Sequence, residues 1–299
     1  MEAWILFTIA AAFLQNLRNG LQKSINSVLS TTGAAYTRFA FGLPLAIIYW
    51  LVLRSLISDE LNWSWLFWTY AFVGGVAQVL AMVTLLLAFA LRGFAVGTAY
   101  AKTETLQTAI FTVIILGEAV SGAALIAIVV SLIGVFVLSS AKSSTGLRSI
   151  LFSWTEKSAL YGLASAALLA VSAVSYRGGA LSLEGEGALL PAASTLVVAL
   201  TIQTTIMTVY LLLKEKGELT NVWQNRGKAS LVGVASMLGS VGWFTAMTLQ
   251  NAAYVRALGQ IELIFTFLTS VLIFRERITK AELGGTLLII GGVLILLLA

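Results

Sequence analysis

Three ionisable side chains lie deep inside long apolar stretches of the sequence: Lys102, Glu104 and Glu262. A charged group is costly at membrane depth, so such residues are candidates for function by default. A buried glutamate can carry a proton for coupling, and an ionised one can receive the ammonium group of a substrate. The residues alone leave both chemistries open. For Lys102, two interpretations also stay open: its amine reaches back toward the cytoplasmic helix end, or it forms an ion pair with another helix.

Glu104 and Glu262 occupy equivalent positions on two related segments, because the second segment follows the first at an offset of 158 residues. With 100° between successive helical residues, each glutamate shares a face with the residue three positions later. We expect the two helices to turn these polar and aromatic faces toward a shared cavity. The faces consist of Tyr100, Glu104 and Gln107 on one helix and of Glu262 and Phe265 on the other.

Further polar and aromatic side chains recur at membrane depth on other predicted helices. They combine amide, hydroxyl, thioether and aromatic groups, a mixture suited to an amphipathic organic molecule rather than a bare ion. As a set they could line the same cavity, whereas core packing is the leading interpretation for any single one of them. The set comprises Gln15, Asn19, Gln78, Met82, Ser240, Trp243 and Phe244.

The composition indicates which elements position these residues. The 299 residues are 59% apolar and 10% charged, whereas soluble domains average about 45–50% and about 25%. Because a membrane-spanning helix needs about 20 apolar residues, the apolar runs predict an all-α polytopic membrane protein with ten transmembrane helices. Pro44 is expected to kink the second of them. The predicted spans lie near residues 4–26, 33–57, 63–90, 94–116, 120–140, 158–180, 189–213, 228–250, 253–273 and 280–298.

Several chemistries are excluded by what the sequence lacks. It has no histidine and no cysteine, and Asp59 is its single aspartate. It therefore cannot assemble a zinc site of nitrogen and sulfur ligands, a Ser-His or Cys-His nucleophile, or a paired-aspartate centre. A Gly-rich phosphate loop of the G-x-x-x-x-G-K-[ST] type is also missing. We expect a protein that is not an enzyme and that uses no metal ion or other cofactor.

The strongest internal signal is a repeat. Shifting the chain by 158 residues places residues 88–140 on 246–298 without a gap, and 14 of the 53 pairs are identical. The sequence thus predicts a first five-helix repeat at 1–140, a cytoplasmic linker at 141–157 and a second five-helix repeat at 158–299. Because five is an odd number, the second repeat enters the bilayer from the opposite side and is inverted. Inverted repeats around a central cavity are typical of alternating-access transporters, although some channels also contain repeats.

The distribution of lysine and arginine predicts the orientation in the membrane. If both termini lie on one side, three of these residues, including Arg256, lie with the termini and fourteen lie on the opposite side. The positive-inside rule then places the fourteen in the cytoplasm. We expect both termini on the periplasmic side of a bacterial inner membrane.

Two turn motifs at equivalent places carry a resemblance to a known family. The turn Leu116-Gly-Glu118 precedes the last helix of the first half, and Arg275-Glu-Arg-Ile278 precedes that of the second half. Together with ten spans in two inverted halves, these motifs resemble the EamA branch of the drug/metabolite transporter superfamily. The segment Tyr100-Ala-Lys-Thr-Glu-Thr105 is most similar to the bacterial aromatic amino-acid exporters of that branch. The branch commonly has a proline upstream of the Leu-Gly-Glu glutamate, where this chain has Thr105 and Leu263, so a proline-broken helix is not expected.

The repeat and the resemblance together imply a secondary transporter that exports amino acids or similar small metabolites from the cytoplasm. Its partners would be a small-molecule substrate and the lipid bilayer, with no nucleic acid, and it would function as a monomer. Three alternatives stay open. A multidrug or cation/proton antiporter would use Glu104 or Glu262 as its exchange site, and a passive channel would conduct small metabolites without alternating access. A lipid flippase or a membrane scaffold that transports nothing would give no amino-acid flux in vesicles.

Overall fold

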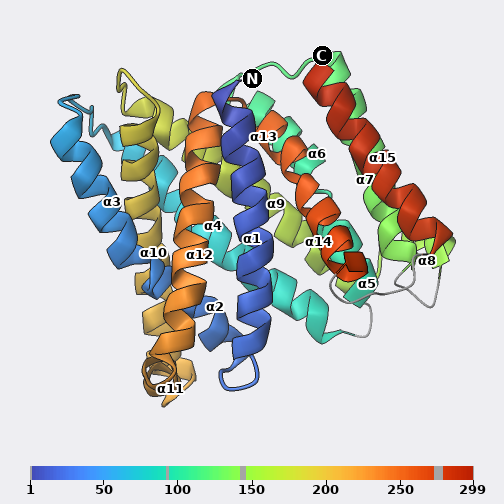
Figure 1. The fold of residues 1–299 in the computed structure, drawn as a ribbon, viewed down its shortest axis with the longest axis horizontal. Coiled ribbons are helices and arrows are strands. Elements are labelled where there is room, and N and C mark those ends of the chain that lie inside the picture. Colours follow the sequence, from blue (N-terminus) through green and yellow to red (C-terminus); the bar gives the residue numbers. More distant parts are fainter. Residues whose placement is uncertain (1, 92–93, 142–145, 273–278, 299) are drawn as a thin grey trace. The chain divides into compact units, whose positions relative to one another are not determined.

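The computed structural model describes residues 2–91, 94–141, 146–272 and 279–298. Helices joined by short loops make up these residues, and none of them lies in a strand (Figure 1). The turn motif at 275–278 lies outside the described residues. In chain order the helices are α1 (Ala3–Ile25), α2 (Thr31–Ala40), α3 (Gly42–Leu56), α4 (Trp65–Ala90), α5 (Phe94–Ala101), α6 (Glu104–Phe111), η1 (Thr112–Leu116), α7 (Gly122–Ala141), α8 (Gly146–Phe152), α9 (Lys157–Ser182), α10 (Leu189–Lys214), α11 (Glu218–Gln224), α12 (Arg226–Leu249), α13 (Ala252–Gly259), α14 (Ile261–Leu272) and α15 (Lys280–Leu298).

Seven helical segments are long and apolar enough to cross a membrane, and they correspond to seven of the ten predicted spans. The chain is therefore an all-helical, multi-pass membrane protein. The predicted span at 4–26 is also one continuous helix, α1, of 23 residues, but it carries Arg18 and Lys23. The count of ten spans remains a prediction. The seven segments are Thr31–Leu56, Trp65–Ala88, Gly122–Ala141, Lys157–Ser182, Leu189–Lys214, Arg226–Leu249 and Lys280–Leu298.

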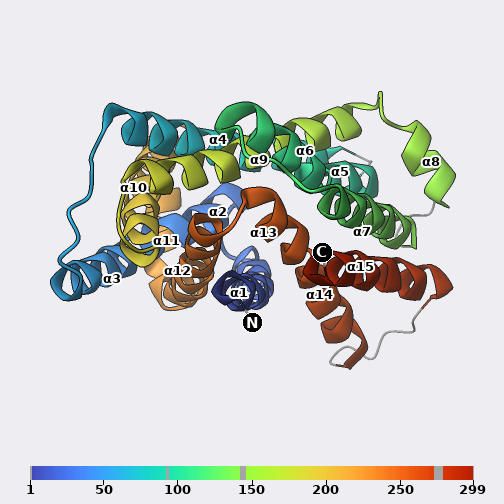
Figure 2. The same ribbon diagram turned by 90° about the horizontal axis from the view of Figure 1, so that it is seen from above.

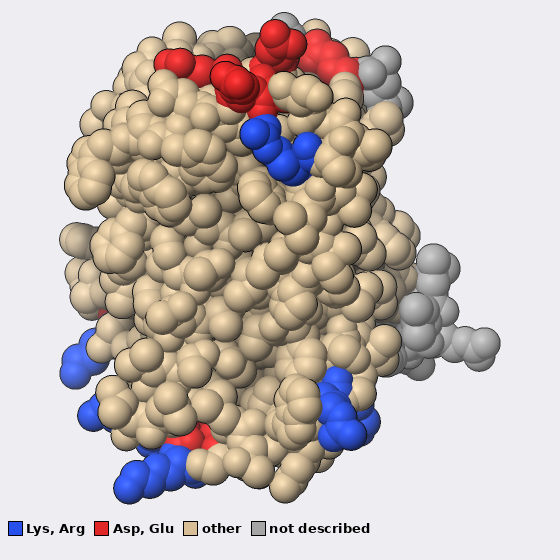
Figure 3. Space-filling view, turned by 90° about the vertical axis from the view of Figure 1, so that its left-hand side faces the viewer, with Lys and Arg blue, Asp and Glu red and all other residues tan. Residues whose placement is uncertain are grey.

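The charged side chains are distributed as a membrane requires. On the face shown in Figure 3, acidic residues gather at one end and most of the basic residues gather at the opposite end. Uncharged side chains fill the broad band between them. Such a band matches the hydrocarbon layer, which excludes charge, while the two ends match the polar headgroup regions.

The expected kink in the second span is present. The span is interrupted at Phe41, where α2 ends and α3 begins. Pro44 has no amide hydrogen, and its ring clashes with the carbonyl four residues earlier, which belongs to Ala40. The interruption therefore falls at the place where the proline removes a helical hydrogen bond.

Two other predicted spans are not continuous, which corrects the sequence prediction. The segment 94–116 divides into α5, α6 and the π-helical turn η1, and the segment 253–273 divides into α13 and α14. Neither break contains a proline. The amide of Lys102 shares its hydrogen between the carbonyls of Thr98 (3.3 Å) and Ala99 (3.2 Å). The next amide, of Thr103, donates to the carbonyl three residues earlier, of Tyr100 (3.1 Å), and the amide of Gln260 donates in the same way to Ala257 over 3.3 Å. This local tightening of the turn ends the α-helical register.

The described chain divides into two compact units. Unit 1 consists of residues 1–76 and 175–250, and unit 2 consists of residues 77–174 and 251–299. Two of the three divisions fall within α4 and α9, and the third falls between α12 and α13. Each unit thus contains segments from both predicted repeats, so equivalent helices of the two repeats pack against each other inside a unit.

In unit 2, the equivalent helices α7 and α15 lie side by side (Figures 1 and 2). Glycines allow this close approach. A Cβ atom added at Gly134 would lie 2.7 Å from the carbonyl oxygen of Gly285, and one added at Gly292 would lie 2.7 Å from that of Ala127. Gly134 of α7 faces Gly285 of α15, and Ala127 of α7 faces Gly292 of α15. The residue numbers therefore rise in opposite directions, and the two helices run antiparallel.

In unit 1, α10 packs against α2 and α3. Tyr36 and Thr208 share a hydrogen bond of 2.9 Å, and the indole of Trp50 donates to Ser194 over 2.8 Å. At the offset of 158 residues, position 36 corresponds to position 194 and position 50 corresponds to position 208. The hydrogen bond Tyr36–Thr208 is therefore the repeat equivalent of the hydrogen bond Trp50–Ser194. Because the lower-numbered residue of one helix contacts the higher-numbered residue of the other, this pair of equivalent helices is also antiparallel.

Candidate functional site

The two broken helices of unit 2 form the core of the candidate site. They break at equivalent positions, because α5 (Phe94–Ala101) and α13 (Ala252–Gly259) have bounds that coincide at the offset of 158 residues. The second half of each helix then begins within a residue of the predicted glutamate, Glu104 in α6 and Glu262 in α14. Both glutamates therefore lie in the first turn of a helix, where the positive end of the helix dipole favours a negative charge.

Two ion pairs connect the broken helices. Lys102 donates to Glu262, and Arg256 forms an ion pair with Glu104 at 3.0 Å. The side chains are 30% and 13% exposed in the first pair, and 16% each in the second. The four charges sum to zero, which lowers the cost of keeping them at membrane depth.

A buried hydrogen bond lies between the two ion pairs. The amide nitrogen of Gln260 donates to the hydroxyl of Thr105 over 2.7 Å, and both residues are buried. Because Gln260 occupies the break between α13 and α14, this bond fixes one break against the start of α6. The two helices thus cross at their breaks, and the contacts between them are polar.

The structure decides the two open interpretations of Lys102 in favour of an ion pair with another helix. It also reveals a functional candidate that the sequence reasoning missed, since Arg256 was assigned to the outer side of the membrane. Arg256 instead lies in α13 and pairs with Glu104. A signal for it exists in the sequence, because Arg256 lies inside the predicted span 253–273, where an unpaired cation is costly.

Tyr100 and Gln107 lie near the breaks but contact other helices. Tyr100 is buried, donates to the carbonyl of Ile150 (3.2 Å) and packs its ring edge against Phe136. Gln107 donates to the hydroxyl of Thr103 over 2.9 Å and to the carbonyl of Leu163 in α9 over 3.5 Å. Tyr100 is therefore part of the packing of unit 2. Phe265, Gln78 and Met82 are half-buried in the same unit, on α14 and α4.

The remaining predicted residues belong to unit 1. The indole of Trp243 donates to the side-chain oxygen of Gln15 over 3.1 Å, which joins α12 to α1. The ring of Phe244 lies 4.5 Å from that of Tyr176 at an angle of 31°. Asn19 is exposed on α1, and Ser240 is half-buried on α12. Unit 1 thus holds an aromatic and amide cluster, while unit 2 holds the charged crossing.

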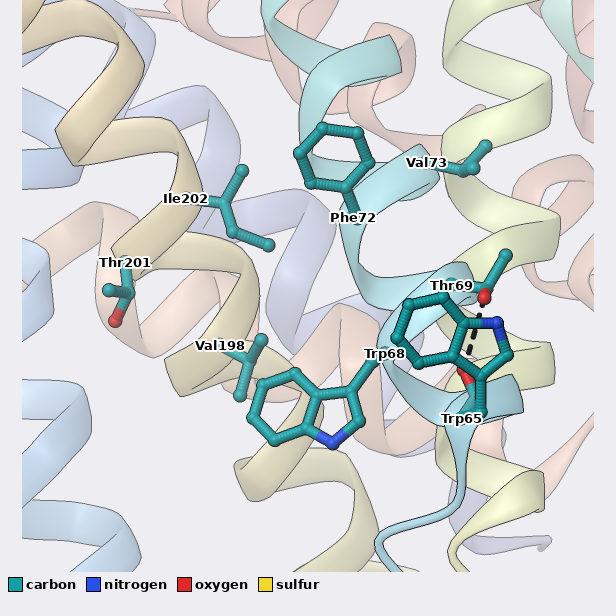
Figure 4. A pocket seen from close by; sticks show the side chains of 8 residues that line it. All are labelled: Trp65, Trp68, Thr69, Phe72, Val73, Val198, Thr201 and Ile202. Carbon is teal, nitrogen blue, oxygen red and sulfur yellow. Dashed lines mark hydrogen bonds between the residues drawn. The ribbon is translucent and has the colours of Figure 1, made fainter.

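An apolar pocket of about 650 Å³ in unit 1 contains none of the predicted residues. Figure 4 shows that α4 and α10 line it. Its few hydroxyl groups are engaged locally, since Thr69 donates to the carbonyl of Trp65 over 3.0 Å (Figure 4). Trp65 is 85% exposed, as expected of a side chain that faces lipid. The pocket is a groove of the apolar surface. Its lining comprises Trp65, Trp68, Thr69, Phe72, Val73, Val198, Thr201 and Ile202.

These features define a polytopic helical membrane protein with paired charges at membrane depth. Residues 156–298 match the EamA-like transporter family. A solved structure described as "Crystal structure of protein" has the same fold, with a TM-score of 0.76, 18% identity, and coverage of 99% of this chain and 96% of that chain. No curated protein matches the sequence.

Proposed function

We propose that the protein is a secondary transporter that exports amino acids, aromatic and other apolar ones above all, or similar small metabolites from the cytoplasm by alternating access. The observation that carries this proposal is the antiparallel crossing of two broken helices with two ion pairs at the crossing. The family match of residues 156–298 supports the same class of activity.

Broken helices favour a transporter for a physical reason. A break exposes backbone groups and helix ends at membrane depth, which transporters use to bind polar solutes. The two equivalent breaks lie against each other here, as expected for inverted repeats that exchange roles between inward-facing and outward-facing states. Ion pairs such as Lys102–Glu262 can part and reform as the helices shift, which supplies the two discrete arrangements that alternating access needs.

The amino-acid specificity rests on the side chains of unit 1 and on the resemblance of residues 100–105 to aromatic amino-acid exporters. The adjacent, tilted rings of Tyr176 and Phe244 offer an apolar aromatic surface, and Gln15 with Trp243 offers amide and indole groups. Substrates with an apolar side chain and polar ends suit this combination. The proposed substrate residues of unit 1 are Gln15, Asn19, Ser240, Trp243 and Phe244. Those of unit 2 are Gln78, Met82, Tyr100, Glu104, Gln107, Glu262 and Phe265, with Lys102 as a further coupling residue.

A specific observation weighs against cation exchange. An antiporter for hydrophobic cations needs a carboxylate that is available to the substrate, yet Glu104 and Glu262 each already hold a basic side chain. A cationic drug would have to displace Arg256 or Lys102 first. We therefore place amino-acid export ahead of multidrug antiport.

The location and assembly are parts of the same proposal. Lysines and arginines predominate on the side of the loops opposite the termini, which favours the cytoplasm for that side and the periplasm for both termini. We place the protein in a bacterial inner membrane and expect a single copy to carry out transport, because each copy contains both repeats.

Counterflow in liposomes that contain only the purified protein tests the proposal. Vesicles are preloaded with unlabelled Phe, Trp, Tyr, Met or Thr in turn, and uptake of labelled Phe is followed. We expect saturable uptake that is stimulated by internal amino acid. Flux without saturation or trans-stimulation would indicate a channel. If folded protein gave no uptake above empty vesicles under several pH gradients, amino-acid export would be excluded and drug cations would become the next substrates to test.

A further inference from the structure

The apolar groove between α4 and α10 has no part in the proposed transport site. Its walls lie within two segments that are long and apolar enough to cross a membrane, Trp65–Ala88 and Leu189–Lys214. The groove encloses about 650 Å³, a volume in the range of about 300–1,000 Å³ that ligand sites have. All eight residues that line it belong to unit 1, and none of the eight is charged. The occupant of the groove therefore lies at membrane depth against an uncharged surface.

The hydroxyl groups in the lining are already engaged. The hydroxyl of Thr69 donates to the carbonyl of Trp65 over 3.0 Å, and that of Thr201 donates to the carbonyl of Val197 over 2.8 Å. A hydroxyl has one hydrogen to donate, so both are used within their own helices. The other lining groups are aliphatic side chains and aromatic rings. This chemistry favours a hydrocarbon occupant, because a polar group placed there would lose its hydrogen bonds.

The walls of the groove are held in a fixed shape. The ring of Trp68 lies 5.2 Å from that of Phe67 and 5.9 Å from that of Trp63. On the opposite wall, Val198 packs against a buried cluster that contains Phe67, and Figure 4 shows Val198 facing Trp68. Rigid, concave walls touch a hydrocarbon chain with more atoms than a flat helix surface does, and dispersion attraction grows with the number of such contacts. The groove therefore holds a chain more firmly than the surrounding lipid-facing surface.

The groove spans the depth of one leaflet. It begins at Trp65, the first residue of α4, which is 85% exposed, and tryptophan favours the headgroup level of a membrane. Its deep end is closed where the two helices touch, because a Cβ atom added at Gly75 would lie 3.0 Å from Cγ2 of Ile202. Along α4, the distance from position 65 to position 75 is roughly 15 Å, which is about half of a hydrocarbon layer of about 30 Å. An extended acyl chain of one leaflet therefore matches the groove in length.

We propose that the groove binds one acyl chain of a bilayer phospholipid, from the leaflet on the side where α4 begins. The chain lies against Trp68 and Phe72 on α4 and against Val198 on α10, with the headgroup at the level of Trp65. Phe72 and Val73 are exposed, so the groove is continuous with the lipid-facing surface and the bilayer supplies its occupant. Because no lining residue is charged, the site recognises the chain and not the headgroup. The inference does not depend on amino-acid export.

Native mass spectrometry of the whole chain in detergent tests the inference. The purified protein is freed of lipid and then supplied with limiting dipalmitoylphosphatidylcholine or dipalmitoylphosphatidylglycerol. We expect one molecule of either lipid to stay bound under activation that removes all others, with equal retention of the two because the lining carries no charge. Dihexanoylphosphatidylcholine, whose chains are too short to fill the groove, should not be retained. Retention of the anionic lipid alone, equal retention of the short-chain lipid, or retention of no lipid would overturn the inference.

The variant Thr201→Phe fills the groove from an exposed position of α10. We expect it to lower the retained fraction of dipalmitoylphosphatidylcholine at least about 5-fold, because the ring takes up the space of the chain. Val209→Phe is the matched control, since Val209 is also exposed on α10 but does not line the groove, and it should retain the lipid. Thr201→Val removes the hydroxyl and keeps the shape, so it should also retain the lipid. If Thr201→Phe retained the lipid as well as Val209→Phe does, the lipid would lie elsewhere on the surface and the inference would be wrong.

Fluorescence locates the bound chain without a variant that fills the groove. A phospholipid with bromine atoms on its acyl chains quenches nearby tryptophans, and Trp65 and Trp68 both line the groove. With one brominated lipid bound per protein in detergent, we expect most of the quenching to be lost in the double variant Trp65→Phe with Trp68→Phe. Trp223→Phe is the control, since Trp223 is exposed on α11, and it should leave the quenching unchanged. Full quenching in the double variant would place the chain outside the groove and overturn the inference.

The same measurements separate the lipid from another occupant and from the transport proposal. If the wild-type protein retained no lipid and formed dimers that Thr201→Phe abolished, the groove would be an interface between two copies and the inference would be overturned. Counterflow is measured independently. Retained lipid without amino-acid counterflow would leave the lipid site standing and contradict export, whereas counterflow by a protein that retains no lipid would do the reverse.

Discussion

At the scale of single residues, four charges at one crossing dominate the chemistry of unit 2. Each glutamate has one basic partner, Lys102 for Glu262 and Arg256 for Glu104. Removal of one member leaves the other charge without compensation at membrane depth, which is more costly than removal of both. A variant that loses one charge of a pair should therefore be impaired more than a variant in which the two charges are exchanged, and this difference can be measured.

We expect Glu262→Gln to reduce the counterflow rate at least about 10-fold, because Lys102 loses its counter-charge. The exchanged double variant Lys102→Glu with Glu262→Lys restores the pair in the opposite direction and should recover a substantial part of the rate. Glu282→Gln is the control, since Glu282 accepts from Thr279 at a helix start and contacts no described cation. Unchanged counterflow in Glu262→Gln and also in Glu104→Gln would remove both glutamates from the mechanism.

The hydrogen bond between Gln260 and Thr105 gives a separate prediction. Gln260→Leu would leave the Thr105 hydroxyl buried without its donor. We expect a loss of about 1–3 kcal/mol in stability, seen as a lower melting temperature in detergent. The exposed Gln224→Leu serves as the control. If both variants had the melting temperature of the wild-type protein, the bond would not fix the crossing of the broken helices.

At the scale of elements, glycine controls how closely helices approach. Neighbouring glycines of α15 differ sharply: a Cβ atom at Gly292 would meet the backbone of Ala127 at 2.7 Å, whereas one at Gly291 would meet nothing within 4 Å. The same contrast holds between Gly285 and Gly284 on this helix. The chain therefore offers its own matched controls for the packing of α7 against α15.

We expect Gly292→Ala to destabilise the protein by about 1–3 kcal/mol through overpacking of α7 against α15. Gly291→Ala should leave stability unchanged or raise it slightly, because alanine favours the helix over glycine. The melting temperatures of the two variants in detergent provide the comparison. Equal melting temperatures would mean that α7 and α15 separate easily enough to accept the methyl group.

The broken helices show what local patterns predict at this scale. The 158-residue offset identified α5–α6 and α13–α14 as equivalents, and their polar faces were predicted from helical periodicity. Their breaks were not predicted, because proline was the expected cause and neither break contains one. The breaks arise from tightened turns at Lys102 and Gln260, and side chains of the opposite helix bind at these positions.

At the scale of the whole molecule, the absence of cysteine makes the topology easy to test. We expect Glu2→Cys to react with a membrane-impermeant thiol reagent in intact cells, because the positive-inside rule places the N-terminus outside. Lys228→Cys, in the first turn of α12 on the predicted opposite side, should react only after the membrane is opened. The reverse pattern of labelling would contradict the predicted orientation.

The sequence by itself determined the helical membrane class, the repeat and the positions at which charge enters the bilayer. These properties depend on composition and on periodicities of a few residues, which are local and therefore readable along the chain. The offset of 158 also predicted which helices are equivalent, and the paired bonds Tyr36–Thr208 and Trp50–Ser194 follow that offset.

The tertiary structure alone decided which charges meet. The periodicity of a helix predicts the direction in which a charged side chain points. Its partner depends on which other helix lies there and at what height along it. Packing across hundreds of residues sets that arrangement. Arg256 pairs with Glu104 although 152 positions separate them. Because the cost of a buried charge depends on its partner, only the folded arrangement shows which charges hold helices together.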